Sequence, residues 1–146
     1  MKKVAIILFV IFAANLTLAQ RNENEKESIK KMIQESYING IFNDGNADVA
    51  KKGVHYDCDI IVFEDGKMRK VPAYSYVERI EENQAGLYPG TSCEFTDILV
   101  TGYAAIAVVE IYRDNGWHNY TDYLSLYKFE DGWKVVSRIA YRYPKE

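Results

Sequence analysis

One carboxylate in this 146-residue chain occupies a position suited to acid–base chemistry. Asp122 lies in an alternating run, so in an extended strand it shares one face with His118, Tyr120, Leu124 and Leu126. Because the two leucines require the interior, the carboxylate should also point inward, where burial and nearby charges shift its pKa. Asp122 is therefore the first candidate for a catalytic acid or base. The alternative is a structural acid that is bonded to the backbone or to a tyrosine.

His55 is the second candidate, because an imidazole titrates near neutral pH and can bind a ligand or act as a base. It lies where a short helix should end and a strand should begin, so the alternative role is to hold that junction. His55, Asp57 and Asp59 alternate, which is a spacing that metal ligands use. A polar strand entry that is solvated by water explains these three residues with fewer assumptions. We therefore expect no metal and no cofactor.

Tyrosine is unusually abundant, with 12 residues in the chain. A tyrosine ring buries a large apolar surface and keeps a hydroxyl group for hydrogen bonding, which suits the wall of a ligand pocket. Plain core packing is the alternative for each ring taken singly, above all for the tryptophan. The predicted ligand-binding rings, which would stack on a flat aromatic molecule, are Tyr37, Tyr112, Tyr120, Trp133 and Tyr141.

Several classes of function lack their signatures. The sequence has no Gly-x-Ser-x-Gly motif and no glycine-rich loop of the kind that binds phosphates. The net charge is −3, and no basic run follows the first residues, so a nucleic-acid partner is not expected.

The first nineteen residues have the pattern of a targeting segment. Lys2 and Lys3 precede an uncharged apolar run from Val4 to Ala14, and Thr17 and Ala19 stand at the −3 and −1 positions of a cleavage site. The run is too short to cross a bilayer, which takes about 20 residues. Residues 1–19 are therefore predicted to be a signal peptide.

Cleavage would leave residues 20–146 as a single exported domain, periplasmic or extracellular, with no membrane attachment. An oxidising compartment allows a disulfide between Cys58 and Cys93. Two buried thiols are the alternative, and the sequence leaves both open.

Three helices are predicted. After a polar start that should fray, the first runs from about Glu25 to Phe42, with isoleucine, methionine and tyrosine recurring on one face. A second, short helix is capped by Asn46 and closed by Gly53, and a third follows Pro72 and is closed by Gly86.

The strands should form an antiparallel sheet. A hairpin is predicted from residues 59–63 and 67–71 around a Glu-Asp-Gly turn. Short turns separate four longer strands, which makes them a meander. These strands are Ser92–Thr101, Tyr103–Arg113, Trp117–Phe129 and Trp133–Tyr143. Helices must then cover one concave face of a curved sheet, which gives an α+β architecture.

Five short motifs carry a family resemblance. They are Tyr37-x-x-Gly40, the Gly45/Asp48 helix junction, Val54-His55-Tyr56-Asp57, Asp122-Tyr123-Leu124-Ser125-Leu126, and Asp131-Gly132-Trp133-Lys134-Val135-Val136. Together they resemble the "putative lumazine-binding" family of the NTF2-like (SnoaL-like) superfamily, over about Glu25 to Tyr143. The resemblance implies a cone-shaped α+β fold, with helices on a strongly curved antiparallel sheet and a cavity between them. It does not decide function, because the superfamily includes isomerases, dehydratases, cyclases and subunits without catalysis.

The leading prediction is an exported protein that binds a small aromatic or heterocyclic molecule without turnover. One alternative is a proton-transfer enzyme of the isomerase, cyclase or dehydratase kind, with Asp122 as acid or base and His55 assisting. The other is a homodimeric interaction subunit that associates through the outer face of its sheet. That face is predicted to carry Val109, Ile111, Tyr123 and Tyr127.

Overall fold

The computed structural model describes residues 20–64, 66–113 and 119–144, and within these ranges helices pack on one six-stranded sheet. The predicted signal peptide lies outside the described residues, as do Trp117 and His118. No helix within the described ranges is long and apolar enough to span a membrane.

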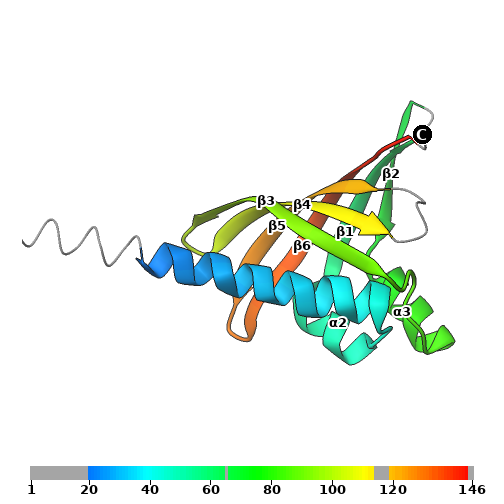
Figure 1. Cartoon of the computed structure of the whole chain (residues 1–146), viewed down its shortest axis with the longest axis horizontal. Helices are drawn as coiled ribbons and strands as arrows, with labels where there is room; N and C mark the ends of the chain where they lie inside the picture. The colour runs from blue at the N-terminus through cyan, green and yellow to red at the C-terminus, as the bar shows by residue number, and fades with distance from the viewer. Residues whose placement is uncertain (1–19, 65, 114–118, 145–146) are drawn as a thin grey trace, which may run out of the picture.

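The sheet has the order β2-β1-β6-β5-β4-β3. Its strands are β1 (Val54–Glu64), β2 (Lys67–Pro72), β3 (Thr91–Thr101), β4 (Ala104–Arg113), β5 (Tyr120–Phe129) and β6 (Gly132–Arg142). The hairpin β1–β2 and the meander β3–β4–β5–β6 are antiparallel, as predicted, and β1 joins the meander by parallel pairing with β6. The curved sheet with helices on one side confirms the α+β class (Figure 1).

The first helix is continuous from residue 20 to residue 43, and its second part, η1 (Ile33–Asn43), has π-helical hydrogen bonding. Figure 1 shows it lying across one face of the sheet, with α2 (Ala47–Gly53) and α3 (Tyr74–Asn83) packed near its C-terminal end. The side chain of Asn46 accepts a hydrogen bond from the backbone N–H of Val49, which confirms the predicted cap.

The start of the first helix does not fray as expected. The Glu25 carboxylate accepts hydrogen bonds from Trp133 Nε1 at 2.8 Å and from Lys128 Nζ at 2.5 Å. These two contacts tie the N-terminal turns to the β5–β6 turn, and they lower the pKa of Glu25.

A β-bulge in β6 decides which side chains face the helices. Ser125 pairs with Ser137 while Leu126 pairs with Val135, so β6 has one extra residue between the two pairs. Trp133 and Val135 face the core, but beyond the bulge it is Arg138 that points inward, with 6% of its surface exposed. Strict alternation from Trp133 and Val135 would place Ile139 on the inner face, but the bulge moves it to the outer face, where it is 52% exposed.

Both cysteines are free thiols. Burial raises the pKa of Cys58 to about 12 and that of Cys93 to about 11, and Cys93 Sγ donates to Gln34 Oε1 at 3.3 Å. Of the two alternatives left open by the sequence, the structure has the unbridged thiols.

Candidate functional site

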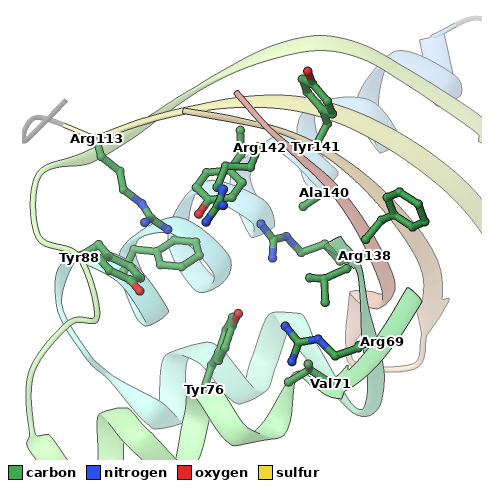
Figure 2. Close-up of a pocket in the computed structure, with 13 residues that line it drawn as sticks. Arg69, Val71, Tyr76, Tyr88, Arg113, Arg138, Ala140, Tyr141 and Arg142 are labelled. Carbon is green, nitrogen blue, oxygen red and sulfur yellow. The ribbon is translucent and has the colours of Figure 1, made fainter. Parts of the chain in front are cut away.

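A cavity of about 750 Å³ opens between the sheet, the C-terminal end of η1 and α3. Its walls come from η1, α3, the loop that follows α3, and five strands of the sheet, β1, β2, β4, β5 and β6. They contribute Phe42, Val62, Phe63, Arg69, Val71, Tyr76, Tyr88, Arg113, Tyr120, Arg138, Ala140, Tyr141 and Arg142 (Figure 2). A volume of this size is typical of small-molecule sites.

Four arginines line this cavity, and no acidic side chain does so in the described part of the chain. Figure 2 shows the guanidinium groups of Arg113, Arg138 and Arg142 around the space above the hydroxyl group of Tyr76, and that of Arg69 beside this hydroxyl. Guanidinium groups are strong, planar hydrogen-bond donors for oxyanions. The cavity therefore combines positive charge with aromatic walls.

Arg138 forms the floor of the cavity together with a partner behind it. Its Nε and Nη2 atoms donate to Asp122 Oδ2 and Oδ1, both at 2.7 Å, and Tyr37 Oη donates to Asp122 Oδ2 at 2.8 Å. All three side chains are buried. Asp122 thus shares an inward face with Tyr120, as predicted, but it does not line the cavity because Arg138 covers it.

Within this cluster, Arg138 stays charged and Tyr37 stays neutral. Burial acts to lower the pKa of Arg138, but neighbouring Tyr37 and Asp122 raise it overall, so the guanidinium stays charged. Burial, with the Asp122 carboxylate adding to it, raises the pKa of Tyr37 well above its usual value. Tyr37 is therefore a neutral hydrogen-bond donor at physiological pH.

Arg113 is held by stacking on aromatic rings. Its guanidinium carbon lies 3.6 Å from the ring centroid of Tyr88, 4.9 Å from that of Tyr120 and 5.8 Å from that of Phe42. Stacking of this kind orients the guanidinium plane without using its N–H donors. Among the described residues, Arg113 Nε is buried and has no hydrogen-bond partner.

The loop that carries Tyr88 is fixed to the end of η1 by backbone contacts. The N–H groups of Leu87 and Tyr88 donate to the carbonyls of Ile41 and Phe42 at 3.0 and 2.9 Å, which satisfies two carbonyl groups at the helix end. This close approach needs Gly86, since a Cβ there would lie 2.3 Å from two carbonyl oxygens of η1. The prediction that Gly86 closes α3 is wrong, because Gln84 takes the left-handed position at the C-terminal end of this helix.

The five predicted ligand-binding rings do not lie together in the structure. Tyr120 lines the cavity, and Tyr37 lies behind its floor as a partner of Asp122. Tyr141 also borders the cavity, but its ring is 56% exposed and packs edge-on against Tyr143. Trp133 is buried at the other end of β6, against Glu25.

Tyr112 does not belong to the cavity. Its neighbours Ile111 and Arg113 alternate with it along β4, Ile111 is buried, and Arg113 lines the cavity, so Tyr112 points to the outer face and is 37% exposed. Alternation alone leaves both faces of a strand open, and the sequence argument selected the wrong face for this ring.

His55 lies in a second, smaller hollow of about 240 Å³, with Lys51, Tyr74, Asp131 and Lys134 among its walls. Its ring stacks on Phe129 at 5.0 Å, and its Nδ1 accepts a hydrogen bond from the Asp57 N–H. Phe129 is seven residues further along β5 than Asp122, which is roughly 23 Å at about 3.3 Å per residue. Asp122 and His55 therefore cannot contact one small ligand together.

The sequence argument missed the arginines. Arg69, Arg113, Arg138 and Arg142 lie on three different strands, and no spacing in the sequence shows that these strands converge. The one available signal is the interruption of the apolar alternation in β6 at Arg138. Among the described residues, no group of three or more His, Cys, Asp or Glu side chains is placed to hold a metal ion.

A sequence profile described as "Putative lumazine-binding" matches residues 24–141, which is most of the chain. The protein therefore belongs to this family, and the sequence resemblance is confirmed. Solved structures agree on the NTF2-like fold. An NTF2-like protein of unknown function from Shewanella baltica OS155 has a TM-score of 0.68 at 24% identity, covering 83% of this chain and 95% of that one. A similar protein from Silicibacter pomeroyi DSS-3 has a TM-score of 0.69 at 13% identity, covering 83% and 98%.

One curated relative has a named activity. A protein from a Cladobotryum species named aldolase FrzH is 26% identical over 101 residues, which is 69% of this chain and 79% of the relative. At this level of identity, the two proteins are distant relatives.

Proposed function

We propose that this protein binds a small aromatic or heterocyclic molecule in the arginine-rich cavity and does not turn it over. The observation that carries the proposal is the convergence of aromatic rings and guanidinium groups on one open space of about 750 Å³. The description of the family supports a heterocyclic ligand.

The arrangement of the acid and the histidine favours binding over catalysis. Both carboxylate oxygens of Asp122 accept hydrogen bonds from Arg138, and one accepts a further bond from Tyr37. A general base must reach the proton that it abstracts, and Asp122 is covered by Arg138. His55 lines a separate hollow.

The test is native mass spectrometry of the protein purified from the envelope fraction of its own host. A retained mass adduct on the wild type is expected. Ala140 lines the cavity, whereas Ala104 does not, so Ala140→Phe should lose the adduct and the matched variant Ala104→Phe should keep it. An adduct that survives equally in both variants would place the ligand elsewhere.

A second candidate is a proton-transfer enzyme that uses Asp122, favoured by the relative named an aldolase. This function requires that Asp122→Asn abolishes a turnover in a protein that still folds. Loss of the fold in that variant would assign Asp122 to structure.

A third candidate is a homodimer formed through the outer face of the sheet. Of the residues predicted for that face, Tyr123 and Tyr127 are exposed, but Val109 and Ile111 point inward and are buried. Exposed apolar side chains of the outer face include Leu99, Ile106, Tyr123, Tyr127 and Ile139, on four neighbouring strands, and such a patch is of the kind that marks an interface. Tyr123→Glu should shift a dimer toward monomer in sedimentation velocity, whereas Tyr56→Glu, at an exposed position on β1, should not.

Export remains part of the proposal. It is supported by the charge and apolar pattern of residues 1–19. N-terminal sequencing of the protein from its host should begin at Gln20, and a chain that retains Met1 would contradict it.

A further inference from the structure

We propose that the cavity selects a planar aromatic acid and that Arg113 is the residue that binds its oxyanion. This inference rests on the proposed binding function and goes further, because it names the chemical class of the ligand and the group that recognises it. It follows from where the charges lie within the cavity.

The four arginines are not equivalent. Asp122 neutralises Arg138 through two hydrogen bonds at 2.7 Å, and this carboxylate is fully buried. Arg113 has no such carboxylate in the described part of the chain, and the exposed side chain of Arg142 points toward the same space (Figure 2). Positive charge in the cavity is therefore left for a ligand to neutralise, and it lies on the side of Arg113 and Arg142.

Arg113 is also organised before any ligand arrives. Its stacking on Tyr88 and Tyr120 orients the guanidinium plane, and the buried Nε–H lacks an acceptor among the described residues. A buried donor without an acceptor is unfavourable, and a carboxylate oxygen would remove that penalty. A side chain that is already ordered also loses little conformational entropy on binding.

The aromatic part of the ligand is inferred from the remaining walls. Phe42, Phe63, Tyr76 and Tyr120 provide ring surfaces around the guanidinium groups. A flat conjugated ring packs on such surfaces, while its acidic group reaches Arg113. An acid without a ring would pair with the guanidinium groups but would leave the aromatic walls in contact with water.

The experiment is isothermal titration with three probes matched in size. These are 2-naphthoate, its uncharged amide 2-naphthamide, and the saturated decahydronaphthalene-2-carboxylate, which has the same carbon skeleton without the aromatic rings. Wild-type protein should bind 2-naphthoate about tenfold or more tightly than 2-naphthamide, because charge-assisted hydrogen bonds are the stronger ones. It should also bind 2-naphthoate more tightly than decahydronaphthalene-2-carboxylate, because only the flat aromatic rings can stack on the cavity walls.

The variant Arg113→Met keeps an apolar side chain in the stack and removes the donors. It should bring the affinities for 2-naphthoate and 2-naphthamide to within about twofold of each other, mainly by weakening the acid. Arg79→Met removes the same charge from an exposed position of α3 outside the cavity wall and should change neither affinity. If Arg113→Met does not fold, Arg142→Met at the exposed position serves instead and should lower the preference for the acid.

The outcomes separate this inference from the proposed function. Equal binding of the acid and the amide by the wild type would overturn the inference and leave the binding function standing. Equal loss of acid affinity in Arg113→Met and Arg79→Met would overturn the role of Arg113. If no probe binds at millimolar concentration, the inference fails, and the binding function is decided separately by the adduct in native mass spectrometry.

Discussion

Arg138 reaches Asp122 diagonally across two neighbouring strands. In the pairing of β5 with β6, Arg138 stands opposite Leu124 and Asp122 stands opposite Ala140, yet two N–H···O hydrogen bonds of 2.7 Å join the side chains. Both are buried, so each charge depends on the other. A buried pair of this kind need not stabilise a fold more than apolar residues would, but the loss of one partner leaves an uncompensated charge.

Asp122→Asn should lower the free energy of unfolding by about 3–5 kcal/mol, because it leaves the Arg138 guanidinium buried without its counter-charge. Urea denaturation measures this value. The double variant Asp122→Asn/Arg138→Met should lose less than the single variant. Asp97→Asn, at an exposed position of β3, is the control. A loss below about 1 kcal/mol for Asp122→Asn would contradict the dependence of Arg138 on this carboxylate.

Tyr37→Phe should lower the free energy of unfolding by about 1–3 kcal/mol, since it removes the hydrogen bond of 2.8 Å to Asp122 Oδ2 and leaves a buried acceptor with one donor fewer. Tyr127→Phe, on the exposed outer face, should be nearly neutral. Thermal and urea unfolding of the two variants side by side test the difference. Equal stability of both would show that the Tyr37 hydroxyl contributes nothing to the cluster.

The buried thiol of Cys58 should make the protein sensitive to alkali. Its pKa rises from 9.0 to about 12 on folding, so its contribution to stability is full below pH 9 and is lost as the pH rises from 9 toward 12. Over that window the free energy of unfolding of the wild type should fall relative to Cys58→Val, with a slope of up to about 1.4 kcal/mol per pH unit. Below pH 8 the difference between the two proteins should not change with pH. If the free energies of unfolding of the wild type and of Cys58→Val changed in parallel up to pH 11, burial of this thiol would be contradicted.

Gly86→Ala should destabilise the junction that positions Tyr88. The added Cβ would lie 2.3 Å from the carbonyl oxygens of Phe42 and Asn43, so the loop must move away from η1. A loss of about 1–3 kcal/mol is expected, together with weaker binding of any cavity ligand. Gly66→Ala is the comparison: its φ of +73° is strained for alanine, but no atom lies within 4 Å, so its effect should be smaller and should not extend to the ligand. A fully stable Gly86→Ala protein would show that the loop has another way to pack.

Much of the fold follows from local signals. The Asn46 cap, the hairpin turn between β1 and β2, and the short turns after β3 and β5 mark where elements begin and end, and the structure confirms these boundaries to within a few residues. The predicted turn between β4 and β5 lies outside the described residues. Such signals are predictive because caps and turns depend on interactions between residues that are close in sequence. The apolar alternation of β5 likewise places Asp122 on the inner face.

The candidate site depends on contacts that sequence spacing does not encode. The bulge between Val135 and Ser137 turns Arg138 inward, and without it Asp122 would have no counter-charge. The guanidinium group of Arg113 is oriented only because the 84–88 loop places the ring of Tyr88 against it. The sequence by itself determined the order of elements, the curved sheet and the inward carboxylate, because these arise from periodicity and turns. Only the tertiary structure decided that arginines converge on one cavity and that Asp122 supports one of them, because those relationships join residues brought together by strand register and by the closing of the sheet over the helices.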